Sequence, residues 1–143
     1  MSLIVPYLNF KGNTEEAFNF YKSVFGGDFT SVQRFGDTPH AGDIPPGQSN
    51  KIMHLSLQVD KDTLLLGSDN LESMGMPPLV EGTNFSLSCH PESVEEGTML
   101  FNALAAGGQV LMPFEKVFWG AHFGMLIDQF GIKWLFNVAE EGA

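Results

Sequence analysis

The chain has 143 residues and a formal net charge of −10; 43% of its residues are hydrophobic and 17% are charged. This size predicts one domain with a core of its own, and seven scattered Lys and Arg residues make no surface for nucleic acid or anionic lipid. No apolar run approaches the roughly 18 residues of a membrane span, no signal-peptide pattern is present, and the single Cys89 excludes an internal disulfide. We therefore expect a cytoplasmic protein with no nucleic-acid partner and no membrane partner.

The first half of the sequence predicts a strand, a helix and three further strands. Residues 4–10 form the first strand, and the helix begins after Asn13, with Glu16 in the capping-box position. The pair Gly26 and Gly27 ends this helix, because glycine adopts the left-handed conformation of a helix C-terminus at low cost. The later segments are strands at 29–35, 51–59 and 63–69, the last two forming a hairpin, and a proline-containing loop at 36–50 that we expect to be a mobile lid.

The second half repeats this order after a Gly/Pro-rich linker at residues 75–82. Ser93 caps the second helix with Glu96 in the box position, and Gly107 and Gly108 end it. The expected strands are 84–90, 109–113, 122–128 and 132–138. Because each half has a helix that stops at a glycine pair, we predict a single domain made of two modules, residues 1–74 and 83–143.

The predicted strands have one apolar and one polar face, because successive side chains point to opposite sides of a strand. Leu55 lies on the apolar side of its strand and His54 on the polar side. In the first strand of the second half, Cys89 lies on the apolar side and Ser88 on the polar side. We expect the apolar faces to meet the helices and the polar faces to line a cavity where the halves meet; a polar face that only meets solvent is the alternative.

Three stretches of the sequence resemble a known family: residues 7–27, 51–57 and, most specifically, 112–134 with its FWGAHFG and DQFGIKW runs. They look like the PhnB-like branch of the vicinal oxygen chelate superfamily, which also holds glyoxalase I, fosfomycin and bleomycin resistance proteins and extradiol dioxygenases. The resemblance implies an α+β fold in which two βαβββ modules form an incomplete barrel around a ligand cavity, commonly in a homodimer.

Domains of this branch are often labelled 3-demethylubiquinone-9 3-methyltransferase. A Rossmann-type methyltransferase needs a glycine-rich turn between a strand and a helix for its nucleotide-like cofactor. This sequence has neither that turn nor the length of such an enzyme. We therefore do not expect methyltransferase activity.

The superfamily's metalloenzymes take their metal ligands from the first and last strands of each module. The matching positions hold no histidine and no carboxylate: they are Tyr7, Asn9, Leu66, Ser68, Ser86, Ser88, Leu135 and Asn137. Hydroxyls and amides alone do not hold zinc or iron. The four histidines, His40, His54, His90 and His122, show no ligand spacing. We therefore expect no metal and no cofactor.

Six residues are candidate ligand contacts: Tyr7, His54, Asp69, Ser88, Trp119 and Phe123. His54 is the only side chain on its polar strand face that titrates near neutral pH, so it suits a general base or a hydrogen-bond donor. Trp119 and Trp134, with Phe118 and Phe123, would form an aromatic wall for an apolar or planar ligand. The alternatives are a structural histidine and aromatic residues of the core. No catalytic residue is assigned, and Cys89 is expected to be a buried, inert thiol.

Three functional classes remain open. The favoured one is a metal-free protein that binds a small molecule in the cavity between the modules. The second is a metal-dependent lyase, isomerase or dioxygenase of the same superfamily, or an enzyme that uses His54 without metal, and the third is a subunit that binds a partner through an apolar patch. The content of 13 Phe and 7 Met exceeds what two helices and two small sheets need in their cores, so we also expect a homodimer.

Overall fold

The computed structural model describes residues 3–39, 42 and 44–139. The chain divides into two compact units, unit 1 up to Val80 and unit 2 from Glu81, within the segment expected to be a linker. Each unit contains one α-helix and one four-stranded sheet in the order strand, helix, strand, strand, strand. The predicted α+β class with two βαβββ modules is therefore confirmed. Within the described residues, no helix has the length and apolar character needed to cross a membrane.

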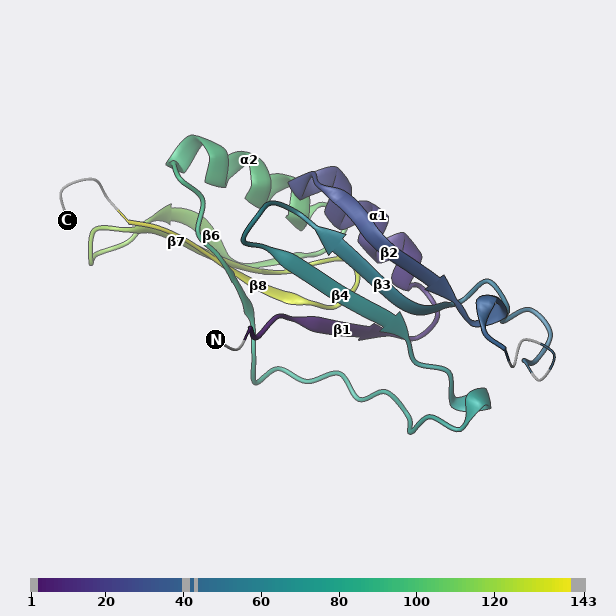
Figure 1. Cartoon of the computed structure of the whole chain (residues 1–143). Helices are drawn as coiled ribbons and strands as arrows, with labels where there is room; N and C mark the ends of the chain where they lie inside the picture. Colours follow the sequence, from purple (N-terminus) through teal and green to yellow (C-terminus); the bar gives the residue numbers. More distant parts are fainter. Residues whose placement is uncertain (1–2, 40–41, 43, 140–143) are drawn as a thin grey trace. The chain divides into compact units, whose positions relative to one another are not determined.

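Unit 1 is a mixed sheet with α1 along one of its faces (Figure 1). Its elements are β1 (Tyr7–Phe10), α1 (Thr14–Phe25), β2 (Asp28–Arg34), β3 (Ile52–Gln58) and β4 (Leu64–Asp69), with short 3-10 helices at Phe35–Asp37 and Glu72–Met74. The strands lie in the order β1-β4-β3-β2, with β1 parallel to β4 and the other pairs antiparallel. Parallel neighbouring strands need a crossover connection, and the connection from β1 to β4 starts with α1.

The contact between α1 and its sheet depends on Gly67 in β4. A Cβ atom at Gly67 would lie 2.6 Å from Cε1 of Phe18, so only glycine leaves room for the buried Phe18 ring. Gly67 is paired with Leu8 of β1 and Leu55 of β3, and both leucines are buried. Leu8, Gly67 and Leu55 therefore lie on the sheet face that α1 covers. Strand alternation predicted this position for Leu55.

The start of α1 differs from the prediction. Asn13 is the N-cap residue, but its side chain makes no capping hydrogen bond, so the expected capping box with Glu16 is wrong. Instead, the backbone N–H and the hydroxyl of Thr14 both donate to Oδ1 of Asp69, at 3.0 and 2.7 Å. The other Asp69 oxygen accepts the backbone N–H of Ile52 at 2.8 Å. One buried carboxylate therefore joins the end of β4 to the start of α1 and the start of β3.

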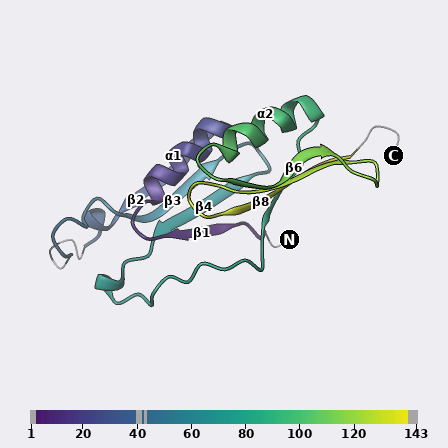
Figure 2. The ribbon, with the colours of Figure 1, turned by 180° about the vertical axis from the view of Figure 1, so that it is seen from behind.

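Unit 2 has the same plan, with α2 along one face of its sheet (Figure 2). Its elements are β5 (Leu87–Cys89), α2 (Val94–Ala105), β6 (Gln109–Lys116), β7 (His122–Ile127) and β8 (Lys133–Val138), in the sheet order β5-β8-β7-β6. Ser93 caps α2 as predicted: its hydroxyl accepts the backbone N–H of Glu96 at 3.0 Å. Phe101 packs edge-on against Phe136 of β8, which places the core of unit 2 between α2 and the sheet.

The C-cap residue of α1 is Gly26 and that of α2 is Ala106, and each helix is followed by a glycine that a larger residue cannot replace. A Cβ atom at Gly27 would overlap the carbonyl oxygen of Gln58 at the end of β3. A Cβ atom at Gly108 would overlap the carbonyl oxygen of Ile127 at the end of β7. The second glycine of each pair is therefore needed for close packing of the chain after each helix against the following hairpin.

Both hairpins are confirmed, whereas three other strands differ in length from their predictions. The first strand starts at Tyr7 rather than at residue 4; before it, the carbonyl of Pro6 accepts a hydrogen bond from Leu66. The strand expected at 84–90 is limited to Leu87–Cys89, and the strand expected at 109–113 continues to Lys116. The lid at 36–50 stays a prediction, because His40 and two of its neighbours lie outside the described residues.

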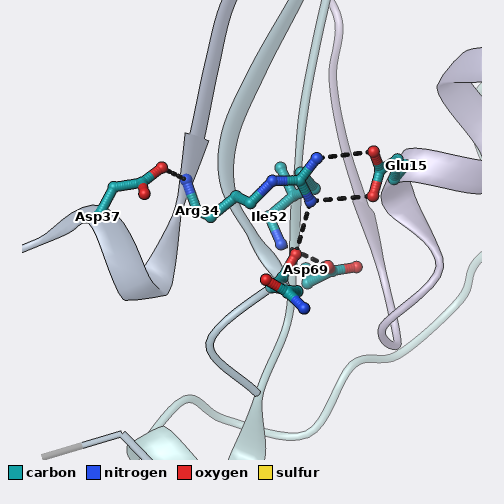
Figure 3. A network of polar contacts seen from close by, with 6 residues as sticks. Glu15, Arg34, Asp37, Ile52 and Asp69 are labelled. Atoms are coloured by element: carbon teal, nitrogen blue, oxygen red, sulfur yellow. Dashed lines mark hydrogen bonds and ion pairs between the residues drawn. The ribbon is translucent and has the colours of Figure 1, made fainter. Parts of the chain in front are cut away.

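A charged network closes the base of the 36–50 loop (Figure 3). Arg34 at the end of β2 makes two hydrogen bonds to the carboxylate of Glu15 in α1, at 2.9 and 2.7 Å, and one to the carbonyl of Asn50 at 2.7 Å. The backbone N–H of Arg34 donates to Asp37. The hydrogen bond from Arg34 lowers the pKa of Glu15 below its usual value. This network is structural, because the guanidinium of Arg34 binds Glu15 and Asn50 while its backbone N–H binds Asp37, all within unit 1.

Candidate functional site: the helix-free sheet faces

In unit 1, the sheet face opposite α1 carries uncharged polar side chains. We call it helix-free face 1; on β1, β3 and β4 it consists of Tyr7, Asn9, His54, Ser56, Gln58, Leu64, Leu66 and Ser68. None of these residues is Asp, Glu, Lys or Arg. Ser68 donates to the amide oxygen of Asn9 at 3.2 Å, and Thr30 of β2 donates to Ser56 at 2.9 Å. On β1, β3 and β4, helix-free face 1 therefore offers hydroxyl, amide and imidazole groups without a fixed charge. On β2 it gains one carboxylate, Asp28, which is paired with Gln58.

Tyr7 and His54 form a pair on this face. The Tyr7 hydroxyl lies 3.3 Å from Nδ1 of His54, and the two ring centroids are 5.8 Å apart. The residues are on β1 and β3, which β4 separates, so both side chains reach over β4 to meet. Tyr7 is 45% exposed and His54 is half-buried, so the pair is ordered by mutual contact and still open to solvent. The structure thus brings together two of the six candidate residues.

Asp69 lies on the other face of the same sheet, away from His54. It is paired with Phe10 of β1, and it is only 2% exposed. Its two oxygens already accept hydrogen bonds from Thr14 and Ile52. Asp69 therefore holds α1 and β3 in place, and we leave it out of the ligand-binding surface proposed below.

Unit 2 has a corresponding surface with a different chemistry, which we call helix-free face 2. The strand pairing places these residues on it: Ser88, Met112, Phe123, Met125, Leu135 and Asn137. The Ser88 hydroxyl lies 2.8 Å from Nε2 of His90, so a hydroxyl–imidazole pair is present in this unit too. Helix-free face 2 thus combines a Ser–His pair with apolar and thioether groups. It also carries two charged residues, Glu115 paired with Phe123 and Lys133 paired with Ile127.

Trp119 and Phe123 meet at the β6–β7 turn, as two further candidate residues. Their ring centroids are 5.8 Å apart in an edge-to-face arrangement, and Phe118 packs edge-on against Trp119 at 4.9 Å. Phe118 is 96% exposed and Trp119 is 53% exposed. Trp134, in contrast, is buried and donates its indole N–H to Asp128 at 2.9 Å, so it belongs to the core.

Sequence reasoning missed His90 and the two methionines. The signal for His90 was available, because Ser88 and His90 are two residues apart in an extended segment and therefore share a face. Met112 and Met125 were harder to assign, because the pairing of β6 with β7 shifts register at Met112 and alternation along the sequence does not show the shift. His122 lies at the start of β7 with its ring 5.5 Å from Phe114.

The residues at the family's metal-ligand positions do not fit a zinc or iron site. Tyr7 is paired with Leu66 and Asn9 with Ser68 in unit 1, and Ser88 is paired with Leu135 in unit 2. These side chains offer no imidazole, thiolate or carboxylate, which such metals require. Across residues 3–39, 42 and 44–139, no three His, Cys, Asp or Glu side chains gather where they could hold a metal ion.

Cys89 is on the helix side of the second sheet, paired with Phe136 of β8. Burial raises the pKa of the Cys89 thiol from 9.0 to about 11, and the negative charge of Glu96 adds to the shift. The thiol therefore stays protonated at neutral pH, in agreement with the predicted inert cysteine.

We expect Cys89 to react with iodoacetamide about 100-fold more slowly in the folded protein than in the urea-unfolded chain at pH 7.5, because a pKa that is higher by two units lowers the thiolate fraction by that factor. The folded-state rate should continue to rise with pH up to about 11. Mass spectrometry of timed, quenched samples measures both rates. Equal rates would show that Cys89 is an accessible, ordinary thiol.

Solved structures share the fold of this chain. A glyoxalase/bleomycin resistance protein/dioxygenase family enzyme from Burkholderia phytofirmans matches with a TM-score of 0.63 at 17% identity, and a glyoxalase-related enzyme from Fulvimarina pelagi matches with a TM-score of 0.60 at 19% identity. Residues 2–136 match the sequence model of the family described as 3-demethylubiquinone-9 3-methyltransferase, and the chain belongs to this family. The resemblance to the PhnB-like branch of the superfamily is confirmed.

Three similar proteins cover nearly all of the chain. The crystal structure of PA1353 from Pseudomonas aeruginosa is 40% identical with a TM-score of 0.85, over 99% of this chain and 100% of that one. A structure described as a putative 3-demethylubiquinone-9 3-methyltransferase, PhnB protein, from Bacillus cereus is 27% identical with a TM-score of 0.77, over 96% and 100%. Protein YjdN of Escherichia coli is 31% identical over 95% of both chains.

Proposed function

We propose that this protein binds a small molecule without a metal, and that helix-free face 1 forms the binding surface. The single observation that carries the proposal is the Tyr7–His54 pair, an imidazole held by a phenol on the polar sheet face opposite α1. The pair presents a hydrogen-bonding imidazole beside a half-exposed aromatic ring, which are groups that suit contact with a small molecule.

The aromatic and thioether groups of unit 2 support the same function. Trp119 and Phe123 offer ring faces and edges for a planar ligand, and Met112 and Met125 offer adaptable apolar contacts. Proteins bind small molecules at surfaces that are mostly apolar with a few placed polar groups. A single cavity lined by both faces, the homodimer and the cytoplasmic location remain predictions.

A metal-dependent lyase, isomerase or dioxygenase of the same superfamily is the alternative. Catalysis of that kind needs a metal acting as a Lewis acid, and the side chains at the family's ligand positions do not supply its ligands. The Ser88–His90 pair gives a second, metal-free route, because a hydroxyl within hydrogen-bond reach of an imidazole can act as a nucleophile. We rank both routes below binding. The first lacks its metal ligands, and in the second no third group among the contacts of the described residues orients His90.

Methyltransferase activity, which the family description names, is disfavoured by the architecture. A Rossmann-type cofactor site lies at the carboxyl ends of a mainly parallel sheet, after a glycine-rich turn. Both sheets here are mixed, with one parallel pair each. The turn from β1 to α1 is Lys11, Gly12 and Asn13, with one glycine.

The test compares ligand binding by the wild type and by His54→Ala in a thermal-shift screen of small aromatic, thiol-conjugate and phosphonate compounds. We expect His54→Ala to weaken binding of a hit about tenfold, which corresponds to the loss of one hydrogen bond, and to change the melting temperature of the free protein by less than about 2 °C. Dialysis against a chelator should leave binding unchanged.

The matched control is His122→Ala, since His122 lies against Phe114 and outside the two residue sets that define the helix-free faces. It should leave ligand affinity unchanged. If His122→Ala and His54→Ala weaken binding equally, His54 has no special part in it. If added Zn²⁺, Mn²⁺, Ni²⁺ or Fe²⁺ stabilises the protein by many degrees or starts turnover, the enzyme alternative replaces the binding protein.

A further inference from the structure

We propose that Tyr7 fixes the protonation of His54, so that Nε2–H of His54 is a hydrogen-bond donor and the ligand presents a neutral carbonyl oxygen to it. This inference rests on the proposed function, because it specifies the ligand of the same face. It adds a positioning role for Tyr7 and a chemical class for the ligand.

The first step is the direction of the Tyr7–His54 hydrogen bond. The only His54 ring nitrogen within reach of the Tyr7 hydroxyl is Nδ1, at 3.3 Å. A phenol is a good donor and a poor acceptor, because its oxygen lone pair is delocalised into the ring, whereas the bare nitrogen of a neutral imidazole is a strong acceptor. The favourable arrangement is therefore O–H of Tyr7 donating to Nδ1. The proton of the neutral ring then resides on Nε2.

The second step concerns what Nε2–H meets. No hydrogen bond to Nε2 of His54 occurs among the contacts of the described residues. His54 is half-buried, and a polar group that a ligand covers costs free energy unless the ligand pairs with it. A donor requires an acceptor, so the ligand that fits this face carries an oxygen acceptor at this point. An amine or amidine would place donor against donor.

The third step selects a neutral acceptor over an anion. On β1, β3 and β4, helix-free face 1 has no Lys or Arg to compensate the lost hydration of a carboxylate or phosphonate. The chain as a whole has a net charge of −10, which repels anions. The neighbouring groups Asn9, Ser56 and Ser68 are neutral donors and acceptors that suit a carbonyl compound. Ketones, esters and amides therefore fit this face better than acids do.

The first experiment measures the tautomer directly, by ¹⁵N-detected NMR of the imidazole nitrogens at a pH where the histidines are neutral. His54→Gln assigns the signal. We expect the Nε2–H form of His54 in the wild type and a marked increase of the Nδ1–H form in Tyr7→Phe. His90 is the internal control: its bond to Ser88 uses Nε2, so its signals should not change in Tyr7→Phe. A wild-type Nδ1–H form, or a tautomer unaffected by Tyr7→Phe, overturns the proposal.

The second experiment compares three probes that share a phenyl ring: acetophenone, benzoate and benzylamine. We expect acetophenone to shift the His54 signals at the lowest concentration, and Tyr7→Phe to weaken its binding about three- to tenfold. Tighter binding of benzoate or benzylamine overturns the carbonyl assignment while leaving the proposed function intact. If none of the three probes binds, the carbonyl assignment is wrong. The proposed function is tested separately, because it fails only if the thermal-shift screen gives no hit.

Discussion

Replacing Asp69 with alanine is expected to lower the free energy of unfolding by about 3–4 kcal/mol. Three donors lose their acceptor at once: the N–H and the hydroxyl of Thr14, and the N–H of Ile52. Both residues are 0% exposed, so water does not replace the carboxylate without a rearrangement of the chain. Chemical denaturation followed by circular dichroism measures the loss.

The matched control is Asp60→Ala. Asp60 also accepts two backbone hydrogen bonds, from Asp62 and Thr63 at 2.8 and 2.9 Å, but it lies in an exposed turn. Water replaces its carboxylate there, so the expected cost is below about 1 kcal/mol. A similar cost for Asp69→Ala and Asp60→Ala would show that burial of Asp69 does not add to its contribution. Asp69→Asn should lie between them, because it keeps an acceptor for some of the three donors.

Replacing Gly27 with alanine is expected to cost about 3–4 kcal/mol, because two penalties combine at this position. Its φ of +91° is a conformation that residues with a Cβ atom rarely adopt, and the added Cβ would overlap the carbonyl of Gln58. Each penalty costs about 1–3 kcal/mol. Denaturation of the purified variant measures the sum.

Two neighbouring glycines separate the two penalties. Gly26 has a φ of +82° with nothing within 4 Å of the position of a Cβ atom, so Gly26→Ala measures only the free-energy cost of the positive φ. Gly108 is not among the glycines with a positive φ, but a Cβ atom there would overlap the carbonyl of Ile127, so Gly108→Ala reports the overlap alone. Gly27→Ala should cost more than either variant. An equal cost for Gly26→Ala and Gly27→Ala would mean that the hairpin moves aside freely.

Local signals in the sequence predicted the elements well. Ser93 and Glu96 are three residues apart, and the cap predicted from that spacing forms. The glycine pairs and the two hairpins are also local patterns, and they gave the repeated unit correctly. Asn13 and Glu16 carry the same local signal as Ser93 and Glu96, yet the Asn13 side chain makes no cap. The difference is Asp69, a residue 55 positions from Thr14 that fills the role.

Strand alternation predicted the face on which His54 lies, but not the exact core. Regular alternation around Leu55 would place Met53 on the same apolar side of the strand. Instead, Ile52 is 0% exposed and Met53 is half-buried. The reason is a register shift: Gln33 is paired with His54, whereas Arg34 is paired with Ile52. A bulge inserts a residue into one strand and reverses the alternation beyond it, and the sequence has no local mark of the insertion.

Periodicity and the conformational limits of single residue types were enough to predict the fold class, the repeat, the helix-breaking glycines and the polar character of the strand face around His54. Which groups meet depends on the assembled sheets. Tyr7 and His54 are 47 residues apart and come together because β4 pairs with both of their strands. Asp69 was a candidate ligand contact from its position alone, and the structure turned it toward α1. Contacts between distant strands depend on register and strand order, which the chain acquires only when its sheets are assembled.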